Sequence, residues 1–205
     1  MAGKILYAFR MTHIDNIQHV AQYGIVRANS PLRNPNFVSI GDRQIIKIRE
    51  EETSQGYRLS EYIPFYFGPR SPMLYVIQNG YNGVSKIEPE KIVYCVIKLE
   101  DLINSDIDCV FTDGHAISNL TRYYDKDKLQ HIDNIIKYED VFSIFWNSEA
   151  DRDFKRRKEA ELLVKNDLPV KFVRGYAVFN DKAQQDLMDM GIPQEQIVIR
   201  PDFYF

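Results

Sequence analysis

The sequence has few of the features that mark membrane, secreted or metal-dependent proteins. It contains two cysteines, four histidines and one tryptophan in 205 residues. No stretch approaches the roughly 18 consecutive apolar residues that a membrane-spanning helix needs. The N-terminal segment MAGKILYAFRMTH has a short apolar patch broken by Arg10 and no small-residue cleavage site, so we expect no secretory signal. These absences predict a cytoplasmic protein that does not associate with membranes.

Several common binding sites are also absent from the sequence. The histidines are scattered without the spacing of metal ligands, so we expect no metal. Cys95 and Cys109 lie within apolar, strand-like runs and are expected to be small buried hydrophobic residues in a reducing compartment. There is no glycine-rich GxGxxG segment, no P-loop and no regular alternation of strands and helices, which disfavours a Rossmann domain.

The overall charge is slightly negative. Lysine and arginine number 26 and aspartate and glutamate 29, for a net charge of -3. This balance argues against broad electrostatic binding of duplex nucleic acid, although it leaves room for a local basic channel. Apolar residues make up 44% of the chain and charged residues 27%, as in ordinary globular proteins, and the length suits one domain over residues 1–205.

The pattern of apolar residues and helix or strand breakers predicts an α+β fold with segregated helices. A helix over residues 12–24 is expected to be capped by Thr12 or Asp15 and ended by Gly24. The proline- and asparagine-rich segment that follows is predicted to be a long surface loop, and loops of this length are usually functional. The expected strands cover 4–9, 74–77, 90–99, 108–112, 160–164 and two later segments; further helices are expected at 45–52, over most of 128–145 and between the last two strands.

Glu161 interrupts an apolar run in the segment RRKEAELLVKN, residues 156–166. As a strand, this segment would place Ala160, Leu162 and Val164 on one face and Glu159, Glu161 and Leu163 on the other. The same residues also favour a helix with a charged face. The pattern alone therefore leaves open whether Glu161 is a site residue or part of a solvated surface.

Five ordered segments of the chain resemble the DarT family of bacterial DNA ADP-ribosyltransferase toxins. They are THIDNI at 12–17, IPFYFGPRSPMLY at 63–75, VFTDGHA at 110–116, RRKEAELLV at 156–164 and the closing IRPDFYF at 199–205. The FYFGPRSPMLY segment is the most specific, since chance seldom reproduces eleven positions with two prolines and several aromatic residues.

The resemblance implies a compact ADP-ribosyltransferase fold with a split central β-sheet, peripheral helices and a cleft for NAD+. Such an enzyme transfers ADP-ribose from NAD+, its co-substrate, to a base in single-stranded DNA and releases nicotinamide. The acceptor is usually thymidine, whereas another branch of the family modifies guanosine. The family members are toxins paired with a DarG antitoxin, whose macrodomain removes the modification. We expect the present protein to be a monomer.

The resemblance also assigns a catalytic role to Glu161, whose carboxylate would stabilise the positive charge that develops on the ribose. Arg49 is the cation expected near the NAD+ phosphates or the acceptor, although it could instead pair on the surface with residues 50–52. Glu159 lies at a position where the family often has glutamine and is expected to steer the acceptor, with its role left open. The residues expected to bind NAD+ are Thr12, His13, Asn16, Arg27, Asn29, Ser39, Arg49 and Tyr66.

The DNA-binding residues are expected in two segments. One is the GPRSPM turn with Arg70 and Met73, and the other is the basic stretch before the catalytic glutamate. Its members are Trp146, Arg152, Arg156 and Arg157, together with Glu159. Each segment also has a purely structural interpretation, as a rigid turn and as a solvated charge run. His13 could likewise be only a helix cap, Tyr66 a core residue, and His115 is expected to hold a turn.

Two alternative functions fit parts of the same sequence. Glu159 and Glu161 form an E-x-E pair, which some protein-modifying ADP-ribosyltransferases carry, so the acceptor could be a protein side chain. A catalytically silent module that binds NAD+ or nucleic acid is the second alternative, and there the replacement of Glu161 would have no effect.

Overall fold

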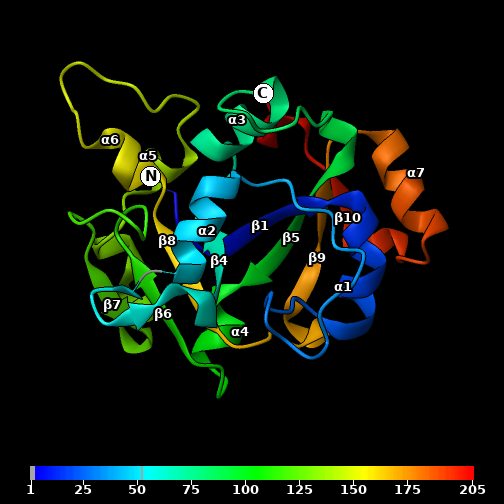
Figure 1. Cartoon of the computed structure of the whole chain (residues 1–205), viewed down its shortest axis with the longest axis horizontal. Helices are drawn as coiled ribbons and strands as arrows, with labels where there is room; N and C mark the ends of the chain where they lie inside the picture. The colour runs from blue at the N-terminus through cyan, green and yellow to red at the C-terminus, as the bar shows by residue number, and fades with distance from the viewer. Residues whose placement is uncertain (1–2, 52) are drawn as a thin grey trace.

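The computed structural model describes residues 3–51 and 53–205 and is organised around one mixed β-sheet (Figure 1). The strand order in this eight-stranded sheet is β10-β9-β5-β1-β4-β8-β6-β7. Neighbouring strands are antiparallel except for β9 and β10, which are parallel. The strands are β1 Tyr7–His13, β4 Tyr62–Tyr66, β5 Ile92–Lys98, β6 Cys109–Thr112, β7 Tyr123–Asp125, β8 Glu161–Lys165, β9 Val173–Val178 and β10 Ile197–Ile199; β2 Thr53–Ser54 and β3 Tyr57–Arg58 form a separate hairpin.

The sheet opens at its centre, between β1 and β4. These two strands pair only at Phe9 and Tyr66, whereas β1 pairs with β5 over its whole length and β4 pairs with β8 over five residues. Beyond this single residue pair the strands β1 and β4 diverge. The sheet therefore consists of two halves that are joined at one point. Arg10 follows Phe9 directly and its Nη1 donates to the Pro64 carbonyl across this opening, at 2.9 Å.

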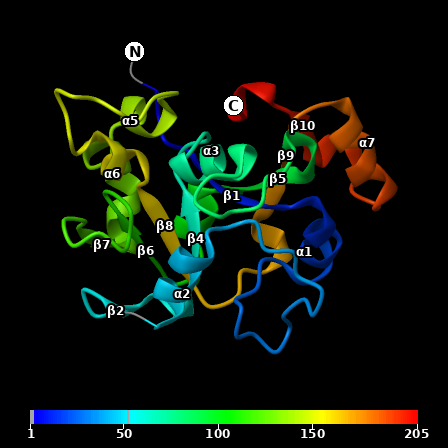
Figure 2. The same cartoon turned by 45° about the horizontal axis from the view of Figure 1, so that its top comes forward.

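Short helices surround the sheet (Figures 1 and 2). Both views place α1 and α7 beside the half that holds β9 and β10, α5 and α6 beside the other half, and α2 in front of the centre. The α-helices are α1 Ile17–Tyr23, α2 Arg43–Glu51, α3 Pro72–Asn79, α4 Leu99–Ile103, α5 Tyr138–Phe142, α6 Phe154–Lys158 and α7 Asp181–Asp189. Turns of 3-10 helix occupy Ile14–Asn16, Leu59–Glu61, Pro89–Lys91, Lys126–Asn134, Val170–Phe172, Gln194–Gln196 and Pro201–Phe203.

The apolar core lies on both faces of the sheet. The larger cluster includes Phe65, Phe67 and Phe111, and a second cluster under α3 includes Leu74 and Tyr94. Cys95 and Cys109 are both free and buried, as expected, and burial raises the pKa of each thiol to about 12. Among the described residues, no helix combines the length and apolar content needed to cross a membrane.

Residues 74–77, predicted as a strand, are instead part of helix α3. The Ser71 hydroxyl caps this helix by accepting from the Leu74 N–H at 3.2 Å, Pro72 occupies the first turn, and Gly80 ends the helix in the left-handed conformation. These caps stabilise the helix ends by about 1 kcal/mol each, enough to outweigh the strand preference of a short apolar run.

Two further expectations differ in detail from the structure. The helix predicted over 12–24 begins with a 3-10 turn capped by His13, whose Nδ1 accepts from the Asp15 N–H, so neither Thr12 nor Asp15 is the cap. The segment predicted as mostly helical, 128–145, contains a 3-10 run and the short α5, because its apolar residues support single turns rather than a continuous helical face.

Candidate active site at the opening of the sheet

Glu161 is the first residue of β8 and lies at the centre of the opening. Its side chain is only 1% exposed. The strand expected here is confirmed, because Ala160, Leu162 and Val164 enter the main core while Leu163 packs in a separate cluster. Glu159 does not belong to that strand, since it follows the last turn of α6. A buried carboxylate at a strand end requires partners, because an unpaired charge in the interior is costly.

Two groups hold the Glu161 carboxylate from opposite sides. The Ala116 N–H donates to Oε1 at 3.0 Å, and the Arg49 guanidinium donates to Oε2. The backbone of Glu161 is fixed as well, since its N–H donates to the Thr112 hydroxyl at 3.1 Å and that hydroxyl donates to the Gly114 carbonyl at 2.7 Å. The carboxylate is therefore held in one orientation before any substrate binds.

Arg49 comes from α2, which carries no buried residue of its own. Burial lowers the pKa of Arg49, but the adjacent Glu161 carboxylate outweighs this effect and the pKa ends above its ordinary value. The Arg49 side chain is only 14% exposed, and its Nη1 is buried without a hydrogen-bond partner among the described residues. The expected alternative was a surface pair with residues 50–52. Among the described residues Arg49 pairs with Glu161 and not with Glu50 or Glu51, and residue 52 lies outside the described residues.

Arg10 is a second partly buried cation at this site, and it was not among the residues predicted from the sequence. Burial lowers the pKa of Arg10, and the charges of Arg49 and Glu161 both act on it. Tyr66 pairs with Glu161 across β4 and β8, and burial together with Glu161 and Glu159 raises the pKa of its phenol. An arginine inside the apolar strand ILYAFRMTH, two residues before Thr12, was the available signal.

His115 lies on the β6–β7 loop with its Nε2 3.8 Å from Glu161 Oε1. Its pKa is lowered by burial, so the imidazole is neutral at pH 7. Its carbonyl also accepts from the Thr121 hydroxyl at 2.8 Å, which is the turn-holding role expected from the sequence. The side chain nevertheless stands beside the carboxylate, so His115 belongs to the site.

Arg156 connects the β6–β7 loop to α6. Its guanidinium donates to both Asp153 carboxylate oxygens, at 2.6 and 2.8 Å, and to Asp113 Oδ1 at 2.7 Å. Arg157 is engaged in the same way by Asp140 and Asp151, at 2.7 and 2.6 Å. Their donors are thus directed at carboxylates within the protein, an arrangement that favours a structural role over the expected contact with DNA.

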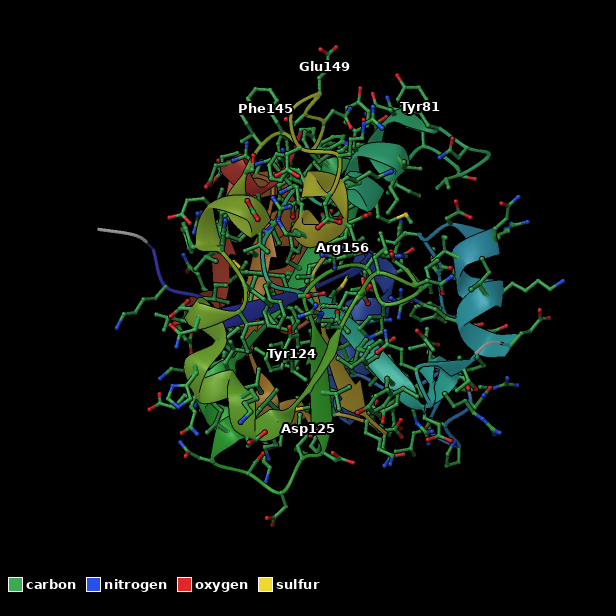
Figure 3. All side chains as sticks on the ribbon, turned by 90° about the vertical axis from the view of Figure 1, so that its left-hand side faces the viewer. Tyr81, Tyr124, Asp125, Phe145, Glu149 and Arg156 are labelled. Atoms are coloured by element: carbon green, nitrogen blue, oxygen red, sulfur yellow. The ribbon has the colours of Figure 1, made fainter. Side chains whose placement is uncertain are left out.

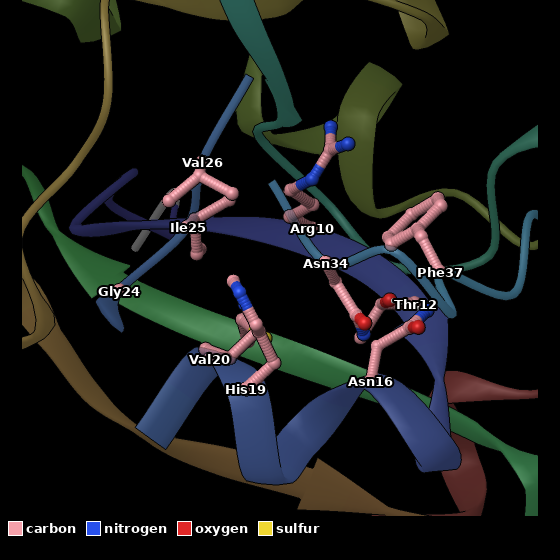
Figure 4. A pocket seen from close by; sticks show the side chains of 11 residues that line it. Arg10, Thr12, Asn16, His19, Val20, Gly24, Ile25, Val26, Asn34 and Phe37 are labelled. Carbon is pink, nitrogen blue, oxygen red and sulfur yellow. Dashed lines mark hydrogen bonds between the residues drawn. The ribbon is translucent and has the colours of Figure 1, made fainter. Parts of the chain in front are cut away.

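A cavity lies on the other side of the opening, between β1, α1 and the loop after α1 (Figure 4). Thr12 and Asn16 line it, together with Arg10, Asn34 and Phe37. The Asn16 amide donates to the Thr12 hydroxyl at 2.9 Å and to the Val38 carbonyl at 2.8 Å. The Val38 N–H donates back to Asn16 Oδ1 at 2.9 Å. Asn16 therefore holds the loop over the cavity.

The other residues expected to bind NAD+ are not among the described residues that line this cavity. His13 caps the following turn and its pKa is lowered by burial. The Arg27 N–H donates to Asp167 Oδ1 at 2.9 Å, while its Nε is buried without a hydrogen-bond partner in the described part of the chain. Asn29 and Ser39 are exposed on the loop.

The residues expected to contact DNA are spread over the neighbouring surface. Arg70 adopts a left-handed backbone conformation, with φ of 53°, and its Nε is buried without a partner among the described atoms. Met73 packs against the second core cluster, and Trp146 belongs to a group of aromatic residues. Arg152 is exposed, and Glu159 is half-buried with its pKa raised to about 7 by burial.

Comparison with known proteins identifies the family. A family model described as "ssDNA thymidine ADP-ribosyltransferase, DarT" matches residues 9–205. The chain belongs to the DarT family. This confirms the resemblance seen in the sequence and the expected enzyme class, a DNA ADP-ribosyltransferase.

Relatives of the chain extend across several bacteria. A DNA ADP-ribosyl transferase of Escherichia coli O127:H6 is 31% identical over 191 residues, which cover 87% of this chain and 83% of that one. A DNA ADP-ribosyl transferase-DNA ADP-ribosyl glycohydrolase fusion protein of Thermosipho africanus is 28% identical over 201 residues, 96% of this chain and 49% of the fusion.

The fold agrees with solved DarT structures. Thermus sp. 2.9 DarT in complex with ADP-ribosylated ssDNA superposes with a TM-score of 0.84 at 23% identity, covering all of both chains. The same protein in complex with NAD+ gives a TM-score of 0.78 at 24% identity, again over all of both chains. The expected α+β fold with a split central sheet is therefore confirmed.

Proposed function

We propose that this protein transfers ADP-ribose from NAD+ to thymidine in single-stranded DNA, with Glu161 as the catalytic carboxylate. The observation that carries the proposal is the buried Glu161 at the sheet opening, held by Arg49 and by the Ala116 N–H. The relatives support it, since the Escherichia coli relative is a DNA ADP-ribosyl transferase and Thermus sp. 2.9 DarT is found in complex with NAD+ and with ADP-ribosylated ssDNA.

The reaction breaks the bond between the ribose C1′ and the nicotinamide nitrogen, and the bonding pair leaves with nicotinamide. The ribose acquires oxocarbenium character, and a carboxylate that accepts a hydrogen bond from a ribose hydroxyl stabilises it. Glu161 is already oriented for this, so little reorganisation is needed in the transition state. The buried Nη1 of Arg49 has no hydrogen-bond partner among the described residues, and it can donate to a phosphate or carbonyl oxygen of the substrates.

The cavity beside Thr12 and Asn16 is the proposed site of the dinucleotide. It now encloses only about 30 Å³. That space holds roughly two or three water molecules at ~10–15 Å³ each. NAD+ is far larger, so the loop held by Asn16 must move outward before it enters. His13, Arg27, Asn29, Ser39 and Tyr66 stay proposed contacts of NAD+ around this opening.

The acceptor must lose a proton when its nitrogen bonds to C1′. Glu159 is a suitable acceptor of that proton, because burial raises the pKa of its carboxyl to about 7 and Lys155, Glu161 and Lys158 all act on it. A group with this pKa is about half deprotonated at neutral pH and can both take and release a proton. Arg70 and Met73 stay proposed contacts of the base or its neighbours.

Further proposals concern the partner, the oligomeric state and the cellular compartment of the enzyme. The glycohydrolase fused to the Thermosipho africanus relative supports a partner enzyme that removes the modification, so we propose a DarG-type antitoxin for this toxin. We also propose that residues 1–205 act as a single domain, as a monomer in the cytoplasm.

The decisive experiment is a gel-shift assay with 5′-labelled single-stranded oligonucleotides, each containing one kind of base, incubated with NAD+. We expect the wild type to retard thymidine strands and the Glu161→Ala variant to lose at least about 10³-fold in rate, as when a main electrostatic group is removed. Glu100→Ala is a matched control, because Glu100 is an exposed glutamate whose ion-pair partner among the described residues is Lys98.

The other outcomes separate the alternatives. Retardation of guanosine strands alone would support the proposed mechanism and identify guanosine, rather than thymidine, as the acceptor. Consumption of NAD+ with labelling of protein, and no labelled strand, would favour a protein acceptor. A Glu161→Ala variant as active as the wild type would refute the assignment of the catalytic residue.

A further inference from the structure

Four aromatic side chains from three distant segments form a cluster at the end of α3. Tyr75 of α3 is at its centre, with ring centroids 5.7 Å from Tyr81, 5.1 Å from Trp146 and 5.3 Å from Phe205. Trp146 and Phe205 are also in contact, at 5.4 Å. We refer to Tyr75, Tyr81, Trp146 and Phe205 as the aromatic cluster.

The aromatic cluster is open to solvent rather than part of the core. Tyr81 is 49% exposed and Phe205 42% exposed, and Phe145, next to Trp146, is 67% exposed. Figure 3 shows Tyr81, Phe145 and Glu149 at the same end of the molecule, with Arg156 below them. Aromatic rings gathered at a surface are unusual unless they bind something, because their burial would otherwise be favourable.

A cavity of about 360 Å³ adjoins the aromatic cluster, and its lining includes Trp146, Arg152 and Lys155. Neither Arg152 nor Lys155 has a carboxylate within ion-pair distance among the described residues, whereas the nearby Asp151 is bound by Arg157. The surface therefore combines exposed aromatic rings with two cations that have no ion-pair partner in the described structure, and its lining also includes Glu149 and Asp151.

The segment that carries these cations is firmly attached to the active site. Lys158, at the end of α6, is buried and donates to the carbonyls of Val141, at 3.2 Å, and Ser143. These bonds fix the start of the segment that contains Trp146. Lys155 stands close enough to His115 and Glu159 for its charge to lower the pKa of both. Lys155, which lines the cavity, therefore lies near two residues that surround Glu161.

We propose that the aromatic cluster, with Arg152 and Lys155, binds the nucleotides of the single-stranded DNA that flank the acceptor base. Aromatic faces stack on bases of any sequence, and cations beside them bind the phosphates, which is how single-strand readers hold their ligands. The proposal rests on the proposed function, since it supplies a binding surface for the same substrate. It gives Trp146 and Arg152, expected to bind DNA, a common surface with Tyr75, Tyr81, Lys155 and Phe205.

The test compares a short oligonucleotide of about 3 nucleotides with a longer one of about 12, within the ~4–16 nucleotides that single-strand-binding folds cover. Each contains one acceptor thymidine, and initial rates give KM for DNA at saturating NAD+. We expect the wild type to show a lower KM for the longer strand. Tyr81→Ala and Trp146→Ala should each raise that KM by about 10-fold, within the range of base stacking on one ring, and leave the KM of the short strand unchanged.

The cations are tested through the salt dependence of DNA binding. The variant with both Arg152→Gln and Lys155→Gln should reduce the slope of log affinity against log salt by about 1 to 1.5, as two fewer phosphate contacts on a single strand require. Tyr7→Ala is the matched control, since Tyr7 is 40% exposed at a distant position of β1. The rise in melting temperature on adding NAD+ checks that each variant is folded with an intact NAD+ site.

Three outcomes would overturn the proposal. A wild-type KM that does not depend on strand length, or variants with unchanged KM and salt slope, would exclude DNA from this surface. Variants that keep DNA binding and instead lose self-association in sedimentation would assign the surface to a second copy of the chain. Failure of the proposed function looks different, because the wild type would then modify no oligonucleotide of either length.

Discussion

Replacing Arg156 with lysine distinguishes a residue that positions the active site from one that binds DNA. The Arg156 guanidinium bridges Asp153 of the α6 region and Asp113 of the β6–β7 loop. That loop also supplies Ala116, whose N–H donates to the Glu161 carboxylate. A lysine ammonium keeps the charge but cannot form both bridges, because it lacks the planar fork of donors.

The size of the effect follows from these bonds. A hydrogen bond to a charged group contributes about 1.5–3 kcal/mol. Arg156 and Asp113 are 15% and 19% exposed, so we expect Arg156→Lys to lower the free energy of unfolding by about 1–2 kcal/mol. If the loop then withdraws the Ala116 N–H from Glu161, kcat should fall about 10-fold, since each 1.4 kcal/mol of transition-state stabilisation is a factor of ten.

The assay measures kcat at saturating NAD+ and DNA, together with DNA affinity by fluorescence anisotropy at several salt concentrations. We expect kcat to fall while the affinity and its salt slope stay as in the wild type. Arg152→Lys, at an exposed position, is the control. The reasoning is refuted if Arg156→Lys leaves kcat unchanged, or if removal of the charge in Arg156→Gln reduces the salt slope by about 0.7, as the loss of one phosphate contact on a single strand would.

Three further predictions concern stability and pH. Burial raises the pKa of Glu159 from 4.5 to about 7, so the folded protein binds its proton more tightly and loses stability as pH rises from about 4.5 to 7. Glu159→Gln should remove this loss, raising the free energy of unfolding at pH 8 by about 2 kcal/mol in urea titrations; equal pH profiles would contradict it. Thr112→Val leaves the Glu161 N–H and the Gly114 carbonyl without their partner and should cost about 2–3 kcal/mol, with Thr112→Ser retaining most of the stability. Gly68→Ala places a Cβ 2.0 Å from the Val141 carbonyl oxygen and should lower the melting temperature by several degrees, on the order of 2 kcal/mol; an unchanged melting temperature would show that α5 shifts freely.

The sequence predicted most of the elements but only part of the site. Alternation of apolar residues was sufficient for β8, because Leu162 and Val164 are buried in the core on one face of that strand. The same reasoning wrongly predicted a strand at residues 74–77, which belong to helix α3, because caps outside the apolar run stabilise the helix. Resemblance identified Glu161 and Arg49, which are 112 residues apart and form an ion pair. The family match does not test these residue assignments, so they stay predictions.

Contacts between segments far apart in the chain could not be predicted from local pattern. Arg10 joins the site only because β1 and β4 separate after one residue pair. Arg156 and Arg157 read as available cations in the sequence, whereas the fold brings Asp113, Asp140 and Asp151 to them. Charge composition alone cannot show which cations are already paired with carboxylates. Arg156 is paired in this way, whereas Arg152 has no ion-pair partner among the described residues.

The ion pair between Arg49 and Glu161 has a consequence for experiments on the resting enzyme. Helix α2 buries none of its residues, so this pair is a main attachment of the helix to the sheet. A variant without the Glu161 carboxylate would release α2 as well as remove the catalytic group. Protease sensitivity around residues 43–51 would then increase in Glu161→Ala, and its inactivity would combine a chemical defect with a disordered entrance. A substrate that displaces Arg49 from Glu161 would loosen the same helix. Substrate binding and the outward movement of α2 would then be coupled through the Arg49 side chain.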